Sequence, residues 1–238
     1  MAKILGIIGG GQLGMMITEA AKKMPKHISK IIVIDPVENC PAAQVGAEQI
    51  LADFKDKNAI ISLADKSDII TYEIESGDSE VLKSVEKNTE INPSPETLSI
   101  IQDKFLQKSF LLKNNIPVPD FMEIKNIEEV QEGLKKFGYP ALLKSRRDAY
   151  DGRGNFKINS ENEIQKAYDY FKGQKLLLEK YVPFKMEVSV IASRNTKGQI
   201  KTYPLVENIH QENILRETIA PARVSEKITK NAENIANM

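Results

Sequence analysis

Ile4-Leu5-Gly6-Ile7-Ile8-Gly9-Gly10-Gly11-Gln12-Leu13-Gly14 opens the chain with an apolar run that ends in a glycine turn. The run is rich in β-branched residues, which favours a fully buried strand. Apolar residues then recur at helical spacing as far as Ala21. The stretch therefore predicts a strand, a glycine turn and a helix, the repeating unit of α/β folds with a parallel sheet.

A second apolar run ends in Asp35. The glycines at 9, 11 and 14 satisfy G-x-G-x-x-G, and Asp35 follows at about the 20-residue distance at which dinucleotide-binding folds keep an acid for the ribose. A glycine turn that leads into a helix suits any phosphate, because backbone N–H groups and the helix dipole point the same way. The alternative is a tight turn without a ligand. The motif predicts a nucleotide fold but does not identify what binds.

A further strand is expected from Asp68 to Glu75, with two carboxylates at its carboxyl end. Ligands of open α/β sheets bind at that end, and alternation predicts that Glu73 and Glu75 share one side. Solvated acids at an exposed strand end are the alternative.

Two prolines in Asn92-Pro93-Ser94-Pro95 then mark a boundary, and Glu96 is expected to start a helix that carries Lys104.

The later half centres on Lys144 to Asn155, a charged loop with two glycines that follows a short apolar strand. A lysine at the end of a rigid strand supplies a point charge, and glycines let backbone N–H groups approach an anion. An exposed β-turn is the alternative, since Asp-Gly is a common hairpin signal.

The remaining pattern predicts helices at 128–137, 161–171 and 225–237, and strands at 175–182, 187–192 and 200–206.

The chain has 238 residues, of which 41% are hydrophobic and 28% are charged. This composition is typical of ordinary soluble globular proteins. Thirty-three basic and thirty-three acidic residues cancel, so neither nucleic acid nor an anionic membrane is an expected partner. Cys40 is the only cysteine, which excludes an internal disulfide and a Cys-rich zinc site. No signal peptide is expected, nor an apolar stretch near the roughly 20 residues of a membrane helix. We expect a cytoplasmic protein.

Taken together in chain order, six motifs resemble one family of ATP-grasp enzymes, the N5-carboxyaminoimidazole ribonucleotide synthases of de novo purine synthesis. The motifs are Gly9-Gly10-Gly11-Gln12-Leu13-Gly14, Thr71-Tyr72-Glu73-Ile74-Glu75, Gln102-Asp103-Lys104, Tyr150-Asp151-Gly152-Arg153-Gly154, Glu179-Lys180-Tyr181-Val182 and Asn208-x-His210. The resemblance runs over nearly the whole chain. An ordered set of this kind is far more specific than any one of its motifs.

The resemblance implies that ATP phosphorylates bicarbonate to carboxyphosphate, which then carboxylates the exocyclic amine of 5-aminoimidazole ribonucleotide. ATP and Mg²⁺ are the implied cofactors, and a homodimer is the implied assembly. The implied fold is an α/β, Rossmann-like parallel-sheet domain followed by an α+β ATP-grasp domain. The implied boundaries are 1–95 for the Rossmann-like domain, 96–118 for a linker helix region, 119–181 for a small ATP-grasp subdomain and 182–238 for the start of the large one.

The resemblance also implies roles for individual residues. The residues implied for ATP are Lys104 and Lys144 at the phosphates, Glu179, Lys180, Tyr181 and Val182 as the hinge against adenine, Glu187 at the ribose, and His210 near the phosphates. The residues implied around the acceptor nucleotide and bicarbonate are Tyr150, Asp151 and Arg153 as the catalytic group, with Glu73, Gly11, Gln12 and Leu13.

Two departures from the family pattern bear on activity. Ala149 stands where the family usually has glycine before Tyr-Asp-Gly. Family members continue beyond the position of Met238 with the acids that bind magnesium and basic residues that hold the ribonucleotide phosphate, so we expect no metal ligand in this chain. A fragment, or a chain completed by a partner, is expected to turn over poorly alone. A dinucleotide-dependent oxidoreductase and a non-catalytic nucleotide-binding fragment are the competing hypotheses.

Overall fold

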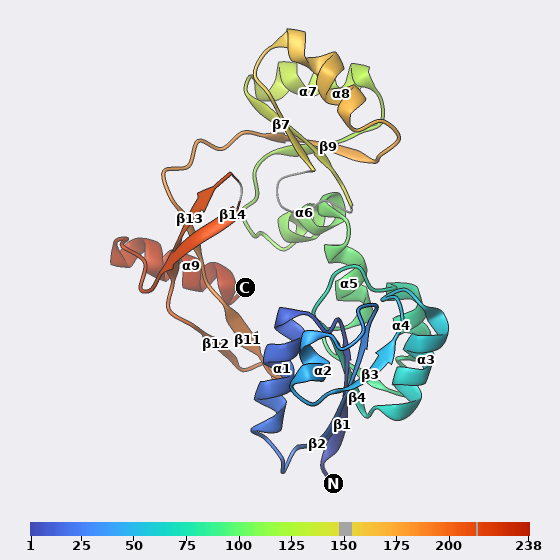
Figure 1. The fold of residues 1–238 in the computed structure, drawn as a ribbon. Helices are drawn as coiled ribbons and strands as arrows, with labels where there is room; N and C mark the ends of the chain where they lie inside the picture. Colours follow the sequence, from blue (N-terminus) through green and yellow to red (C-terminus); the bar gives the residue numbers. More distant parts are fainter. Residues whose placement is uncertain (148–153, 213) are drawn as a thin grey trace. The chain divides into compact units, whose positions relative to one another are not determined.

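The structure is a computed structural model that describes residues 1–147, 154–212 and 214–238. The chain forms two compact units, Met1–Asp103 and Lys104–Met238, each of which has its own sheets and helices (Figure 1). In the described part of the chain, no helix combines the length and apolarity needed to cross a bilayer.

The first unit is built on a five-stranded parallel sheet in the order β3-β2-β1-β4-β5. Its strands are β1 (Lys3–Ile8), β2 (Ile28–Asp35), β3 (Glu48–Leu51), β4 (Ile69–Tyr72) and β5 (Glu90–Ile91). Its helices are α1 (Gln12–Lys22), α2 (Pro41–Gln44), α3 (Lys57–Lys66), α4 (Ser79–Val85) and α5 (Pro95–Ile101). The chain runs outward from β1 to β3 and then returns to the other side with β4. The reversal between β1 and β4 is where open α/β sheets bind ligands.

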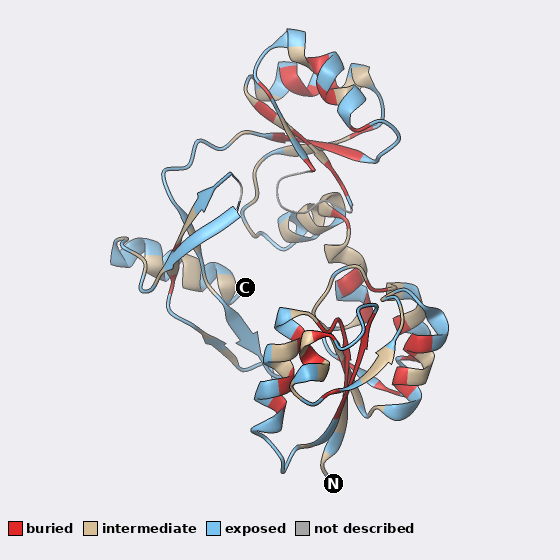
Figure 2. Ribbon diagram, viewed as in Figure 1, coloured by how far each residue is buried: buried red, intermediate tan, exposed pale blue. Residues whose placement is uncertain are grey.

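Both faces of this sheet are covered, which explains the continuous apolar runs of the sequence. Ile8 and Ile34 face a core shared with α3, α4 and α5, whereas Ile7 and Val33 face a second core shared with α1 and α2. Buried residues follow the central strands in Figure 2. The predicted Rossmann-like, parallel-sheet fold is confirmed.

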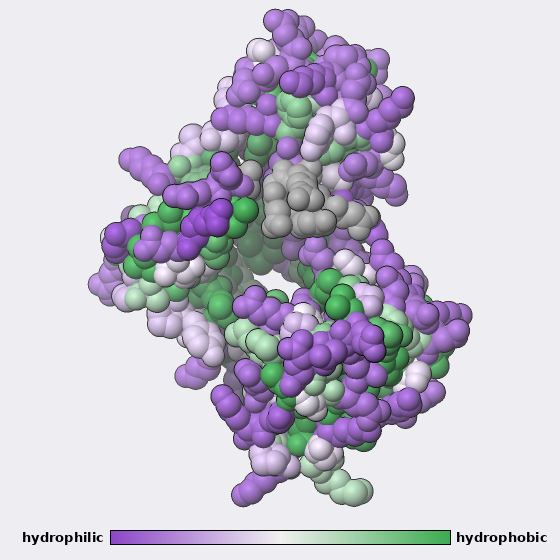
Figure 3. All heavy atoms as spheres, viewed as in Figure 1, coloured by the Kyte–Doolittle hydropathy of each residue, from purple (hydrophilic) through white to green (hydrophobic). Residues whose placement is uncertain are grey.

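The second unit begins with α6 (Lys104–Lys113) and a four-stranded antiparallel sheet in the order β6-β9-β7-β8. The strands are β6 (Phe121–Ile124), β7 (Ala141–Ser145), β8 (Asn155–Ile158) and β9 (Leu176–Lys180). Helices α7 (Ile127–Phe137) and α8 (Ile164–Tyr170) pack on the sheet, with the 3-10 turn η1 (Glu161–Glu163) before α8. Figure 3 shows mostly hydrophilic side chains on the outer sides of these two helices. The sheet therefore has one helix-covered apolar face.

The same unit ends in short antiparallel strands and a helix. One sheet has the order β10-β13-β14, from Glu187–Ser189, Val206–Gln211 and Ile214–Ile219. The other pairs β11 (Ala192–Arg194) with β12 (Ile200–Thr202), and α9 (Glu226–Ala236) follows. Arg223 donates two hydrogen bonds, of 2.9 and 2.6 Å, to the buried Glu207 carboxylate on β13. This charged pair attaches the segment before α9 to the sheet.

Four local predictions are wrong. The strand expected at 68–75 ends at Tyr72, so Glu75 lies in a turn and is exposed, whereas Glu73 is half-buried. The helix expected to run through Lys104 is two helices, because α5 ends at Ile101 and α6 begins at Lys104. The strand expected at 187–192 is interrupted, because β10 ends at Ser189 and pairs with β13, whereas β11 begins at Ala192 and pairs with β12. The strand expected at 200–206 is interrupted as well, because β12 ends at Thr202 and β13 begins at Val206.

Candidate functional site

The glycine turn after β1 is shaped by close packing. Gly9 has φ of +102°, a conformation that favours glycine. A Cβ at position 10 would lie 2.4 Å from Cys40 Sγ, and one at position 14 would lie 2.3 Å from the carbonyl oxygen of Gly9. These glycines let the first turn of α1 and the segment before α2 approach β1, whether or not a ligand is present.

Asp35 fixes this turn from the end of β2. The backbone N–H of Gly10 donates to Asp35 Oδ2 at 2.8 Å, and the N–H of Val37 donates to Oδ1 at 2.8 Å. The aspartate is only 6% exposed. Both carboxylate oxygens are therefore occupied by the chain itself, in the position where a dinucleotide fold would offer an acid to a ribose.

Glu73 approaches the same turn from the residue after β4. The N–H of Gly11 donates to Glu73 Oε1 at 3.3 Å, and a Cβ at position 9 would overlap the Glu73 carboxyl. Burial raises the pKa of the Glu73 carboxyl, the Gly11 N–H opposes this shift, and the charge of Asp35 adds to it. Gln12 and Leu13 start α1 beside the turn and are exposed. The structure thus brings the predicted acceptor residues of the first unit together at the β1–β4 reversal.

A charged cluster lies at the junction of β7, β9 and α6 in the second unit. Lys144 Nζ donates to Glu179 Oε1 at 3.0 Å, and Lys108 Nζ lies 2.7 Å from Glu179 Oε2. The Glu179 side chain is 8% exposed, and the two lysine side chains are 17% and 18% exposed. One nearly buried carboxylate is shared by two lysines. We call these three residues the Glu179 cluster.

Lys104 is joined to the strand that carries Lys144. Its backbone N–H donates to the carbonyl of Arg146 at 2.9 Å, and its Nζ lies 3.5 Å from the carbonyl oxygen of Ser145. The Arg146 guanidinium pairs with Glu123 on β6 and lies 4.9 Å from the centroid of the Phe105 ring. The start of α6 is thereby tied to the end of β7. The two lysines predicted for ATP phosphates lie in the same part of the unit.

The predicted hinge comprises the last two residues of β9 and the two residues that follow it. Lys180 ends the strand and pairs with Asp120 at 3.4 Å. Lys157 Nζ lies 4.2 Å from the centroid of the Tyr181 ring, and Val182 is exposed. Glu179 lies inside the strand, where its Cα partners are Phe121 on β6 and Leu142 on β7. Its carboxylate pairs with Lys144 and Lys108. Contacts to adenine are therefore expected from Tyr181 and Val182, which follow the strand.

Glu187 and His210 lie on paired strands, as neighbours. His210 Nδ1 is 3.6 Å from Glu187 Oε1, and Glu187 is the Cα partner of Asn208. Asn208 Nδ2 donates to Ser189 Oγ at 2.8 Å, which links the same two strands. The structure therefore brings together the acid and the histidine that the resemblance places at the ribose and phosphates.

The predicted catalytic residues Tyr150, Asp151 and Arg153 lie outside the described residues. Within the described ranges, no group of three His, Cys, Asp or Glu side chains is placed to hold a metal ion. Sequence reasoning missed Lys108. Its spacing of four residues from Lys104 was the available signal, because residues at i and i+4 share one helix face.

Two family models match the chain. The ATP-grasp domain matches residues 109–238, and the ribonucleotide synthetase preATP-grasp domain matches residues 1–102.

Named relatives extend this similarity. The chain is 41% identical to phosphoribosylaminoimidazole carboxylase of Ogataea methanolica, over 99% of this chain and 44% of that protein. It is 38% identical to N5-carboxyaminoimidazole ribonucleotide synthase of Bacillus subtilis, over 98% of this chain and 60% of that protein. The chain thus spans between two fifths and three fifths of the length of these relatives.

A solved structure is also similar to this chain. The synthase from Aspergillus clavatus, in complex with ADP and 5-aminoimidazole ribonucleotide, matches with a TM-score of 0.91 and 35% identity. The match covers 99% of this chain and 61% of that one.

Proposed function

The chain belongs to the ATP-grasp family, and we propose that it serves the ATP-dependent carboxylation of 5-aminoimidazole ribonucleotide. In this reaction ATP phosphorylates bicarbonate to carboxyphosphate, and the exocyclic amine of the ribonucleotide attacks the carboxyl carbon and releases phosphate. The product is N5-carboxyaminoimidazole ribonucleotide, an intermediate of purine synthesis. The single observation that carries the proposal is the lysine-rich junction of β7 and α6, which supplies the charge that phosphoryl transfer requires.

For ATP, we propose that Lys104 and Lys144 hold the phosphates. Phosphoryl transfer asks a protein for positioning and charge neutralisation more than for covalent chemistry. Tyr181 and Val182 follow the sheet, so their backbone groups are available to an adenine edge. The pair of Glu187 and His210 supports the ribose and phosphate roles, since an acid accepts from ribose hydroxyls and a histidine donates to a phosphate.

For the acceptor, Glu73 and the neighbouring residues Gly11, Gln12 and Leu13 are our proposed contacts. The raised pKa of Glu73 and its place at the β1–β4 reversal support this assignment. The proposed roles of Tyr150, Asp151 and Arg153 rest on the family motif alone. Magnesium would neutralise ATP phosphates, as it does in phosphoryl transfer generally. Among the described residues, no group of three His, Cys, Asp or Glu side chains is placed to hold a metal ion, and we assign no residue to magnesium.

Three further expectations are part of the proposal. Residues 119–181 would act as the small ATP-grasp subdomain and 182–238 as the start of the large one, after the Rossmann-like domain at 1–95 and the linker region at 96–118. A homodimer and a cytoplasmic location follow from the kind of enzyme proposed.

A chimera tests the function. Residues 1–238 would replace the matching part of the Bacillus subtilis synthase, and ADP release would be measured with and without 5-aminoimidazole ribonucleotide and bicarbonate. We expect release that requires both. Lys144→Met should slow it by about 100-fold, as removal of one preorganised charge contact does. A folded chimera whose ADP release ignores the ribonucleotide would overturn the proposal.

The chain itself tests the oxidoreductase alternative. Calorimetry should show ATP binding with magnesium, and fluorescence should show no binding of a reduced nicotinamide dinucleotide. The physical reason is that Asp35 is buried and each of its oxygens already accepts a backbone N–H, so the acid is not exposed to the ribose of such a cofactor.

A further inference from the structure

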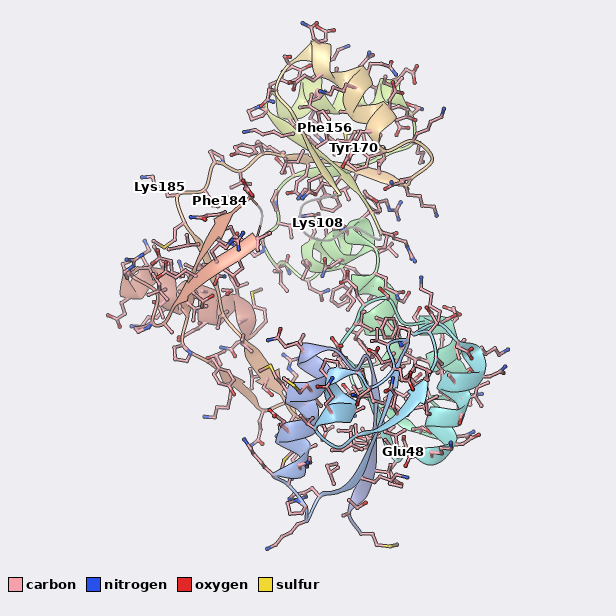
Figure 4. All side chains as sticks on the ribbon, in the orientation of Figure 1. Glu48, Lys108, Phe156, Tyr170, Phe184 and Lys185 are labelled. Atoms are coloured by element: carbon pink, nitrogen blue, oxygen red, sulfur yellow. The ribbon has the colours of Figure 1, made fainter. Side chains whose placement is uncertain are left out.

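Lys108 is the member of the Glu179 cluster that the proposed function leaves without a role. Its Nζ lies 2.7 Å from Glu179 Oε2, while Lys144 takes Oε1 at 3.0 Å. Figure 4 labels Lys108 on α6. Both lysines are more than four-fifths buried, so their pairing with one carboxylate is weakly screened by solvent.

We propose that Lys108 is a positioning residue that keeps the Glu179 carboxylate occupied when Lys144 binds a nucleotide phosphate. The inference rests on the proposed function, because it assigns Lys144 to the phosphates of ATP. A phosphate that takes Lys144 must compete with Glu179 for the ammonium group. Lys108 lowers the cost of that competition, because it remains as the partner of the carboxylate.

Charge explains why the second lysine matters. With Lys108 present, the cluster carries two positive charges and one negative charge, and so attracts an anion. Without Lys108, Glu179 and Lys144 form a neutral pair. The nearly buried carboxylate would then have Lys144 as its remaining cation in the cluster, and losing that cation to a phosphate would leave an uncompensated buried charge.

The backbone holds the three groups in place. Glu179 lies in β9 between β6 and β7, so it is fixed by strands on both sides. Lys144 lies on the adjacent β7, whereas Lys108 reaches the same carboxylate from α6. Because the two lysines come from different elements, Lys144 can turn toward a phosphate while Lys108 stays on Glu179.

Calorimetry on the 238-residue chain tests this role, with ATP, inorganic triphosphate and adenosine as ligands in the presence of magnesium. The variants are Lys108→Met, Lys108→Arg and the double variant Lys108→Met with Glu179→Gln. Lys113→Met is the matched control, since it removes an exposed lysine from the last turn of the same helix. Circular dichroism establishes that each variant is folded before binding is measured.

Lys108→Met should raise the Kd for ATP and for triphosphate about tenfold and leave the Kd for adenosine unchanged. Lys108→Arg should restore binding, because a guanidinium pairs with the same carboxylate. The double variant should recover to within about threefold of the native Kd, because the acid that retains Lys144 is gone. This recovery separates positioning from a loss of packing, which the second substitution would not repair.

Binding of triphosphate by Lys108→Met that equals the native chain, or a double variant that is weaker than Lys108→Met, would overturn the inference while the proposed function stands. A native chain that binds neither ATP nor triphosphate would overturn both. If Lys108→Met does not fold, the comparison of Lys108→Arg with Lys108→Gln decides, since a neutral amide at 108 should weaken triphosphate binding and a guanidinium should not.

Discussion

The glycine turn of the first unit and Lys144, a member of the Glu179 cluster of the second, both indicate an anion site in sequence, yet the acids beside them are used in opposite ways. In the turn, the chain's own carboxylates accept from the amides of Gly10 and Gly11. In the cluster, one carboxylate is outnumbered by two lysines. An anion must displace an acid at the turn, whereas it joins a surplus of positive charge at the cluster. Glycine spacing alone therefore does not establish a phosphate site.

The turn favours a different kind of ligand. Its acids come from the ends of β2 and β4, and one of them has a raised pKa. The Glu73 carboxylate, which accepts a long hydrogen bond of 3.3 Å from Gly11, can also accept from amines and hydroxyls. This difference agrees with the proposed roles, which place the acceptor nucleotide at the first unit and the ATP phosphates at the second. The following substitutions test each side, beginning with the largest expected effect.

Gly14→Ala tests whether the turn is a packing motif. The new Cβ would lie 2.3 Å from the carbonyl oxygen of Gly9, and backbone on either side would have to move. We expect the free energy of unfolding to fall by about 3 kcal/mol, measured by urea denaturation followed by circular dichroism. Gly77→Ala is the control, because its Cβ would meet ordinary contacts of 3.6 Å or more. Equal stability of the two variants would show that the turn tolerates a side chain.

Lys144→Met tests the charge surplus of the Glu179 cluster. Removing a nearly buried cation should raise the Kd for ATP about 100-fold, measured by calorimetry. Lys125→Met is the control, because that lysine is 70% exposed and its pair with Glu123 spans 3.9 Å. A Kd that changes as little as in the control would place the phosphates elsewhere.

Asp35→Ala tests the acid that fills the turn. The change leaves the N–H groups of Gly10 and Val37 without their acceptor and should cost about 2 kcal/mol of stability. Asp35→Asn keeps one oxygen and should cost about half as much. Glu38→Ala, at an exposed site three residues on, should be neutral. Stability is measured by thermal denaturation. Equal melting temperatures for all three variants would contradict the structural role of Asp35.

Glu73→Gln tests the second acid and should have the smallest effect. The folded chain binds the Glu73 proton more tightly than the unfolded chain, because burial raises the pKa. Stability from this group is therefore full below the ordinary pKa of 4.5 and is lost as the pH rises through the raised value. The glutamine variant should lose less stability from pH 4.5 to neutral pH, by about 0.5 kcal/mol since the site is partly exposed. If the free energy of unfolding changed with pH in the same way for the native chain and for Glu73→Gln, this effect of Glu73 would be contradicted.

Much of the fold was predictable because local pattern and packing agree. The runs before Gly9 and Asp35 are apolar without alternation, which is what a strand buried on both faces requires. The helix at 127–137 has Asn126 as its N-cap, and its end at Gly138 has φ of +76°. The ATP-grasp family model, which matches residues 109–238, covers the part of the chain that follows the parallel sheet.

The missed features depend on contacts between distant residues. Nothing near Glu179 in sequence shows that Lys108 and Lys144 share its carboxylate, since they lie 71 and 35 positions away by residue number. The position at which α5 ends also depends on a residue distant in sequence. Asp103 is buried, and the Lys104 N–H donates to the carbonyl of Arg146, so the helix does not continue. The predicted strand at 187–192 is interrupted because β10 pairs with β13, which follows the β11–β12 hairpin in the sequence.

The bond from the Lys104 N–H to the Arg146 carbonyl has a calorimetric consequence. It ties the helix that carries two lysines to the strand that carries the third, so the charged groups are held before any nucleotide arrives. Ordering them costs little conformational entropy on binding. ATP binding should then show a favourable enthalpy with a small entropic penalty, and the amide of Lys104 should exchange slowly with solvent deuterium even in the absence of nucleotide.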